Sequence, residues 1–185
     1  MVKIVQKENP ILREKAKEVP VEEIGSKKVQ KIITNMKKAL ATEPDGVAIA
    51  APQIEESLRV FVMSKRVFKM MPRRPANKTG IGVPTKTSGE HFKDLVFINP
   101  RITKMSREKE ESEEGCLSVR YLYGKVMRAK KATIEAYDER GKKFISGGSG
   151  IIAQIFQHEC DHLDGILFTD KAKNLREILP EEMKK

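Results

Sequence analysis

The stretch Gln157-His158-Glu159-Cys160-Asp161-His162 holds two of the three histidines of this chain and decides how the rest of the sequence is interpreted. On a helix, residues four apart project from one face, so His158 and His162 can bind one metal ion. Glu159 directly follows the first of them. The chance that two of three histidines stand four apart with Glu after the first is about 0.3%. The pattern therefore indicates a metal site on a helix.

The number of protein ligands separates a catalytic metal site from a structural one. A structural site is usually closed by four ligands, whereas a catalytic site has three and leaves a position for water. We expect Cys116 as third ligand, because a thiolate binds first-row metals tightly and Gly115 precedes it in a turn that could aim it. Glu182 is the alternative, at the spacing of one metalloprotease pattern, but it follows Pro180 in a segment expected to fray. Cys160 should point away from the metal as a small buried apolar side chain.

The spacing of apolar residues predicts an α+β fold, with short antiparallel strands around a central metal-binding helix. One amphipathic helix is expected over residues 21–41, ended by the Pro and Gly of Glu43–Gly46, and the metal-binding helix from Ser149 to Gly165. Strands are expected at Leu58–Met63, Leu95–Asn99 and Ala132–Tyr137. A hairpin turn is expected after the last of them, at Glu139–Lys142. An arm without secondary structure is expected at 8–13, and a solvated stretch at 107–114.

The composition predicts a single domain over residues 1–185. Of the residues, 39% are apolar and 34% charged, which suits a folded chain with one core. No apolar run approaches the roughly 18 residues of a membrane span, and no apolar stretch follows the first residues, so membrane insertion and secretion are disfavoured. The two cysteines offer no disulfide framework, and a reducing cytoplasm is the expected location.

Much of the net charge of +10 falls in one segment. Residues 64–93 contain eight basic side chains and one acidic side chain, and the Pro- and Gly-rich part, Met70–Gly89, predicts an exposed loop insertion. The alternative is a patch that binds RNA. Because few aromatic residues accompany the charges, we favour a solvated insertion.

Three blocks of this sequence resemble the signature motifs of the peptide deformylases and occur in that family's order. They are Gly46–Gln53 (GVAIAAPQ), Glu114–Ser118 (EGCLS) and Gln157–Gly165 (QHECDHLDG). Shorter stretches also resemble the family, namely Pro10–Arg13, Phe97–Pro100 and Leu167–Asp170. The chain departs from the family pattern in Ala48, where Gly is usual, in Arg120, where Pro is frequent, and in the longer connection 64–93. Since Ala48 adds only a methyl group, we expect an altered fit to substrate more than a loss of activity.

The resemblance implies a metal-dependent hydrolase that removes the formyl group from the initiator methionine of newly made proteins and releases formate. It assigns Cys116, His158 and His162 to the metal. Fe²⁺ is the ion expected in the cell, with Zn²⁺, Ni²⁺ or Co²⁺ as replacements. The ion would lower the pKa of its bound water and make a nucleophile available at pH 7.

The same resemblance assigns the other catalytic and substrate-binding roles. Glu159 would take a proton from the water and deliver it to the departing amine. Gln53 and the backbone N–H of Leu117 would stabilise the oxyanion. Ile151 and Ile155 would form the apolar slot for the methionine side chain; ordinary core packing is the alternative for both, and for Ile155 it explains the residue almost equally well. The substrate would add as a strand beside Gly46, Val47, Ala48 and Gly115.

Two other functions are compatible with the sequence. One is an endopeptidase that uses His158, His162 and Glu182; the other is a basic RNA- or ribosome-binding module with a structural metal. For a deformylase we expect N-formylmethionyl nascent peptides as partners, transient association with the ribosome, and no membrane or sequence-specific nucleic-acid binding.

Overall fold

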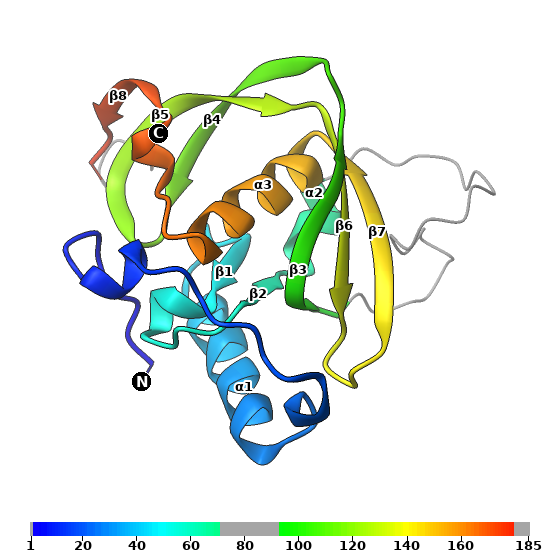
Figure 1. Ribbon diagram of the computed structural model, residues 1–185. Coiled ribbons are helices and arrows are strands. Elements are labelled where there is room, and N and C mark those ends of the chain that lie inside the picture. The colour runs from blue at the N-terminus through cyan, green and yellow to red at the C-terminus, as the bar shows by residue number, and fades with distance from the viewer. Residues whose placement is uncertain (1, 71–92, 180–185) are drawn as a thin grey trace.

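The computed structural model describes residues 2–70 and 93–179, which form two antiparallel sheets and three α-helices (Figure 1). The larger sheet has the strand order β1-β2-β3-β6-β7, and the smaller sheet has the order β4-β5-β8. The helices are α1 (Lys27–Thr42), α2 (Arg66–Met70) and α3 (Ile151–Leu163). The strands are β1 (Ala48–Ala50), β2 (Val60–Met63), β3 (Leu95–Met105), β4 (Lys109–Cys116), β5 (Val119–Ala129), β6 (Lys131–Tyr137), β7 (Lys143–Ser149) and β8 (Lys173–Glu177). The α+β class is confirmed.

Helix α3 lies between the two sheets (Figure 1). It contacts β1, β3, β6 and β7 of the larger sheet and β5 of the smaller one. Its apolar face packs into a core that includes Phe61 and Phe97, whose rings stack with centroids 4.4 Å apart. Since α3 carries the two neighbouring histidines, this packing fixes them between β4 and the larger sheet.

Helix α1 covers the other face of β1 and β2. Strand β2 reads Val-Phe-Val-Met, and successive side chains of a strand point to opposite faces. Phe61 and Met63 pack with α3, whereas Val60 and Val62 pack with α1. A continuous apolar strand buried on both faces is the result.

Both predicted boundaries of α3 are confirmed. Gly150 caps its first turn, and Gly165 follows its end with a φ of +74°, a conformation that favours glycine. The predicted hairpin between β6 and β7 is also present, with Gly141 at a φ of +78°. The expected strands correspond to β2, β3 and β6, although β3 continues to Met105.

The predicted start of the first helix was wrong. Helix α1 begins at Lys27, because the Oγ of Ser26 accepts a hydrogen bond from the Val29 N–H at 3.3 Å and caps the helix there. Residues Val21–Glu23 form a separate 3₁₀ turn. The arm at Pro10–Arg13 is likewise a short 3₁₀ turn that buries Leu12 completely.

Two stretches expected to be solvated contain secondary structure. Part of the predicted insertion forms α2, whose Val67 and Phe68 are buried. Residues 71–92, which hold most of that insertion, lie outside the described residues. The charged stretch before Cys116 forms β4, paired along its length with β5. The side chains of β4 are mostly charged and exposed, so its sequence lacks the alternation of apolar and polar residues that predicts a strand. The strand forms because it pairs with β5.

Within residues 2–70 and 93–179, no helix is long and apolar enough to cross a membrane.

Candidate active site

Three side chains with metal-ligating atoms meet where the end of β4 faces α3. The ligand atoms of Cys116, His158 and His162 all lie within 4.8 Å of one another. The Sγ of Cys116 is 3.1 Å from the Nε2 of His162, and the two imidazole rings are 4.9 Å apart. The structure thus brings together the three residues that the sequence predicts as ligands.

Burial and charge favour the thiolate form of Cys116. Burial raises the pKa of a thiol, but the neighbouring imidazoles of His162 and His158 outweigh this effect and lower the pKa of Cys116 to about 5. The Ser118 N–H, 3.4 Å away, and the Nε2 of Gln53, 3.5 Å away, also point at the sulfur. A thiolate beside two imidazoles is a donor set that suits first-row divalent metals.

Glu114 holds the ring of His158. Its Oε2 lies 2.9 Å from the Nδ1 of His158, and the guanidinium of Arg128 donates to both carboxylate oxygens, at 2.6 and 2.9 Å. Burial raises the pKa of Glu114, but these bonds outweigh it and lower the pKa to about 2. The ionised carboxylate therefore accepts from Nδ1, and Nε2 is left to face the other ligands.

The chain of ion pairs that begins at His158 and Glu114 extends through Arg128 to Asp161 on α3 and to Lys171 at the surface. Arg128, only 4% exposed, also donates to Asp161 at 2.7 Å, and Asp161 accepts from Lys171 at the same distance. Neither Glu114 nor Arg128 is among the residues predicted to have a role in the site. The position of Glu114 in the EGCLS block could have indicated that it functions in the site. No local sequence pattern indicates a role for Arg128, because it meets Glu114 only through the pairing of β4 with β5.

Glu159 lines the same pocket with a carboxyl group that is 4% exposed. Burial raises the pKa of Glu159 to about 7. Among the described residues, its Oε2 and the Nδ1 of His162 are the buried side-chain atoms without a hydrogen-bond partner. A carboxyl group with a pKa near neutrality, unpaired and beside a ligand cluster, is suited to carry a proton.

Gln53 presents an oriented amide donor to the cluster. Its Oε1 accepts a hydrogen bond from the Ala50 N–H at 2.8 Å, which identifies the other end as the N–H₂ group. That group donates to the Oγ of Ser118 at 3.0 Å and faces the sulfur of Cys116. The side chain is only 2% exposed, so its orientation is fixed by the bonds it makes.

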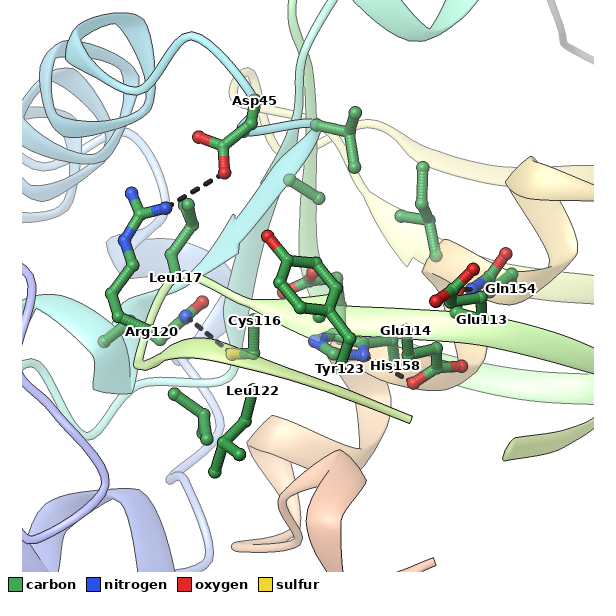
Figure 2. Close-up of a pocket in the computed structure, with 18 of the residues that line it drawn as sticks. Asp45, Glu113, Glu114, Cys116, Leu117, Arg120, Leu122, Tyr123, Gln154 and His158 are labelled. Atoms are coloured by element: carbon green, nitrogen blue, oxygen red, sulfur yellow. Dashed lines mark hydrogen bonds and ion pairs between the residues drawn. The ribbon is translucent and has the colours of Figure 1, made fainter. Parts of the chain in front are cut away.

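A cavity of about 350 Å³ opens beside these groups (Figure 2). All the residues predicted to contact substrate line it, namely Gly46, Val47, Ala48, Gly115, Leu117, Ile151 and Ile155. At Gly115, a Cβ atom would lie 2.6 Å from the ring of Tyr123, so this ring needs the glycine. Ile155 is also part of the core around α3, and both interpretations of this residue therefore apply to it.

Arg120 lies at one end of the cavity (Figure 2). Its guanidinium is 2.9 Å from Asp45 and also forms an ion pair with Glu43.

Cys160 is buried in the core, and burial raises the pKa of its thiol to about 12, as expected for a side chain that faces away from the ligands. The alternative ligand Glu182 lies outside the described residues.

Comparisons with known proteins identify the family to which this chain belongs. A family model described as polypeptide deformylase matches residues 1–177. The peptide deformylase of Pelotomaculum thermopropionicum is 37% identical over 180 residues, which cover 97% of each chain. Peptide deformylase 1A of Arabidopsis thaliana, chloroplastic/mitochondrial, is 39% identical over 170 residues; they cover 91% of this chain and 60% of that relative, so this chain spans about three fifths of its length.

Solved structures show the same similarity. A class I type b peptide deformylase from Acinetobacter baumannii superposes with a TM-score of 0.74 at 28% identity, covering 92% of this chain and 98% of the other. A peptide deformylase from Synechococcus elongatus, solved in complex with actinonin, gives a TM-score of 0.72 at 26% identity, covering 94% and 79%. Since the family model extends over 177 of 185 residues and relatives match nearly the whole chain, this chain belongs to the peptide deformylase family.

Proposed function

We propose that this protein is a metal-dependent hydrolase that removes the formyl group from the N-terminal methionine of newly synthesised proteins and releases formate. The observation that carries the proposal is the cluster of Cys116, His158 and His162 beside a pocket that also contains Glu159 and Gln53. Membership of the peptide deformylase family supports it.

We propose that Cys116, His158 and His162 hold one divalent ion, Fe²⁺ in the cell, with Zn²⁺, Ni²⁺ or Co²⁺ as replacements. Two observations support the fit: the low pKa of the thiol and the bond from His158 Nδ1 to Glu114, which leaves Nε2 available. When bound, such an ion lowers the pKa of a water molecule and supplies a nucleophile at neutral pH.

Glu159 carries the proton in this proposal. Its carboxylate, whose Oε2 has no hydrogen-bond partner in the protein, accepts a proton from the water that adds to the formyl carbon. It then delivers the proton to the amine nitrogen as the C–N bond breaks, so that formate and a free amino terminus leave. The raised pKa of Glu159 makes both transfers feasible near pH 7.

Gln53 and the Leu117 N–H stabilise the negative charge that develops on the formyl oxygen. The amide of Gln53 is neutral and donates into the cluster, held there by its bond to Ala50. Donors fixed before the reaction need no reorganisation when the charge appears.

The peptide binds as an added strand between β1 and β4. In the sheets formed by the described residues, β1 is an edge strand of one sheet and β4 of the other, and residues of both line the pocket. Edge strands offer unpaired N–H and C=O groups to an extended peptide. Pairing through the main chain ignores side chains, which suits a substrate class of many different proteins. The methionine side chain enters the apolar end formed by Ile151 and Ile155.

Formate release separates this function from the two alternatives. With a formyl-Met tripeptide as substrate, the protein should release formate and leave the peptide bonds intact. An endopeptidase would cleave internal bonds and lose activity on truncation after Asp170, which removes Glu182 and keeps Cys116. An RNA-binding module with a structural metal would release nothing. Ribosome association and a cytoplasmic location stay predictions.

A further inference from the structure

Val5 and Gln6, near the N-terminus, donate hydrogen bonds to the backbone carbonyls of Gln53 and Leu117, the two residues that carry the proposed oxyanion donors. The Val5 N–H donates to the backbone carbonyl of Gln53 at 2.9 Å. The side-chain Nε2 of Gln6 donates to the carbonyl of Leu117 at 3.1 Å, and its Oε1 is 3.4 Å from the Arg120 N–H. One amide side chain therefore spans the turn between β4 and β5, which lies more than 100 residues away in the sequence.

The carbonyl that Gln6 binds belongs to the peptide group between Leu117 and Ser118. The N–H of that same group lies 3.4 Å from the sulfur of Cys116. A peptide group is planar and trans, so its C=O and N–H point in opposite directions. Holding the carbonyl toward Gln6 consequently holds the N–H toward the thiolate.

The rear of this turn borders a second cavity, of about 310 Å³. It is lined by Val2, Lys3, Ile4, Gln6, Thr42, Glu43, Leu117 and Arg120. Leu117 and Arg120 line the substrate pocket as well, so the turn forms the partition between the two cavities. The hydrogen bonds of Gln6 restrain the turn on that side.

We propose that Gln6 is a positioning residue for the metal site: its amide orients the Leu117–Ser118 peptide so that the N–H faces the sulfur of Cys116. The predicted effect on turnover rests on the proposed function, whereas the effect on the sulfur–metal bond needs no substrate.

The experiment compares two variants of Gln6 with a matched control, each loaded with Co²⁺. Gln6→Leu removes both hydrogen bonds to the turn, along with a longer one to the Ile4 carbonyl, and Gln6→Glu keeps an acceptor for Arg120 but loses the donor to Leu117. Gln30→Leu is the control, because the Nε2 of Gln30 makes two side-chain-to-backbone bonds, both at 2.9 Å, far from the ligands. The readouts are the thiolate-to-cobalt charge-transfer band, Co²⁺ affinity, thermal stability and steady-state rates.

Both Gln6 variants should shift the charge-transfer band to longer wavelength, because a sulfur without its N–H donor holds its electrons less tightly. Metal affinity should fall about 10-fold, as is typical when a group that supports a ligand is lost. A drop in kcat of about 10-fold is expected, with a much smaller change in KM. Gln30→Leu should lower thermal stability and leave the band, the affinity and kcat unchanged.

A wild-type band and affinity in both Gln6 variants would overturn the inference, as would equal changes in Gln30→Leu. If Gln6→Leu fails to fold, Gln6→Glu decides the outcome on the same readouts. If the wild-type protein releases no formate, the proposed function fails, but the cobalt band still tests Gln6 independently.

Discussion

Glu159 acts as a proton carrier in the proposed mechanism and not as a ligand. Glu159→Ala should therefore keep one metal ion per chain and lose roughly 10²- to 10⁴-fold in kcat, the usual contribution of a general acid–base group. Elemental analysis of the purified variant, together with formate release, measures both quantities. Loss of the metal with normal turnover in the remaining loaded fraction would instead identify Glu159 as a structural residue.

Glu114 gives a prediction about pH and stability. Although burial opposes ionisation, hydrogen bonds from Arg128 and His158 lower the pKa of Glu114 from 4.5 to about 2. A carboxyl group with a lowered folded-state pKa contributes stability that is present above the unfolded pKa and is lost as the pH falls through the folded one. The window is thus about pH 4.5 to 2.

Glu114→Gln should remove this contribution. The variant will be less stable at neutral pH, because buried Arg128 loses one of its two charged partners and keeps only Asp161. Its free energy of unfolding should then fall less steeply than that of the wild type between pH 4.5 and 2. Urea unfolding of the metal-free proteins across this range measures the difference, and parallel pH curves would contradict the assignment.

The residues of the site differ in how readily the sequence predicts them. His158 and His162 are predictable because a four-residue spacing on a helix is a local pattern. Cys116 follows from its chemistry and a preceding glycine. The pair of Glu114 and Arg128 depends on the register of β4 and β5, which no local pattern specifies.

Among the secondary-structure elements, the end of α3 packs against the N-terminal arm at Gly165. Its φ is +74°, and a Cβ there would lie 2.6 Å from the carbonyl oxygen of Arg13. Gly141, in the β6–β7 turn, has a φ of +78° and nothing within 4 Å of its would-be Cβ. Gly141→Ala therefore isolates conformational strain, whereas Gly165→Ala adds a clash with backbone.

Gly141→Ala should cost about 1 kcal/mol, the usual strain of a left-handed alanine, and lower Tm by about 2–4 °C. Gly165→Ala should lower Tm by more, because the backbone at Arg13 must move. Thermal unfolding of the two variants side by side measures the difference. Equal shifts in Tm would show that the arm yields to the added methyl group without cost.

The elements also show where sequence patterns succeed. Helix α3 was predictable because apolar periodicity, a glycine before it and a glycine after it agree. Helix α1 was predicted six residues too early because Ile24 continues the apolar spacing, although Ser26 caps the helix behind it. Strands β4 and β8 carry mostly exposed side chains and form through pairing with β5, so their sequences contain no apolar alternation.

For the whole molecule, the open question is whether the basic segment 64–93 is only a solvated insertion in the single domain. Arg73, Arg74 and Lys78 belong to the predicted insertion, outside the described residues. If the segment is a solvated insertion, replacing all three by Ser should leave both tripeptide turnover and ribosome association unchanged. Cosedimentation with ribosomes at two salt concentrations measures this, and weaker, less salt-dependent binding by the variant would favour an electrostatic role.

In the proposed function, one ion held by Cys116, His158 and His162 enables this chain to release formate. The most direct measurement removes the metal with a chelator, restores one equivalent of Fe²⁺ without oxygen, and counts formate and new amino termini from a formyl-Met tripeptide. The proposed function predicts no release without metal, equal amounts of both products after restoration, and no restoration in Cys116→Ser, while Cys160→Ser behaves like the wild type. Formate release that survives metal removal, or full restoration in Cys116→Ser, would contradict it.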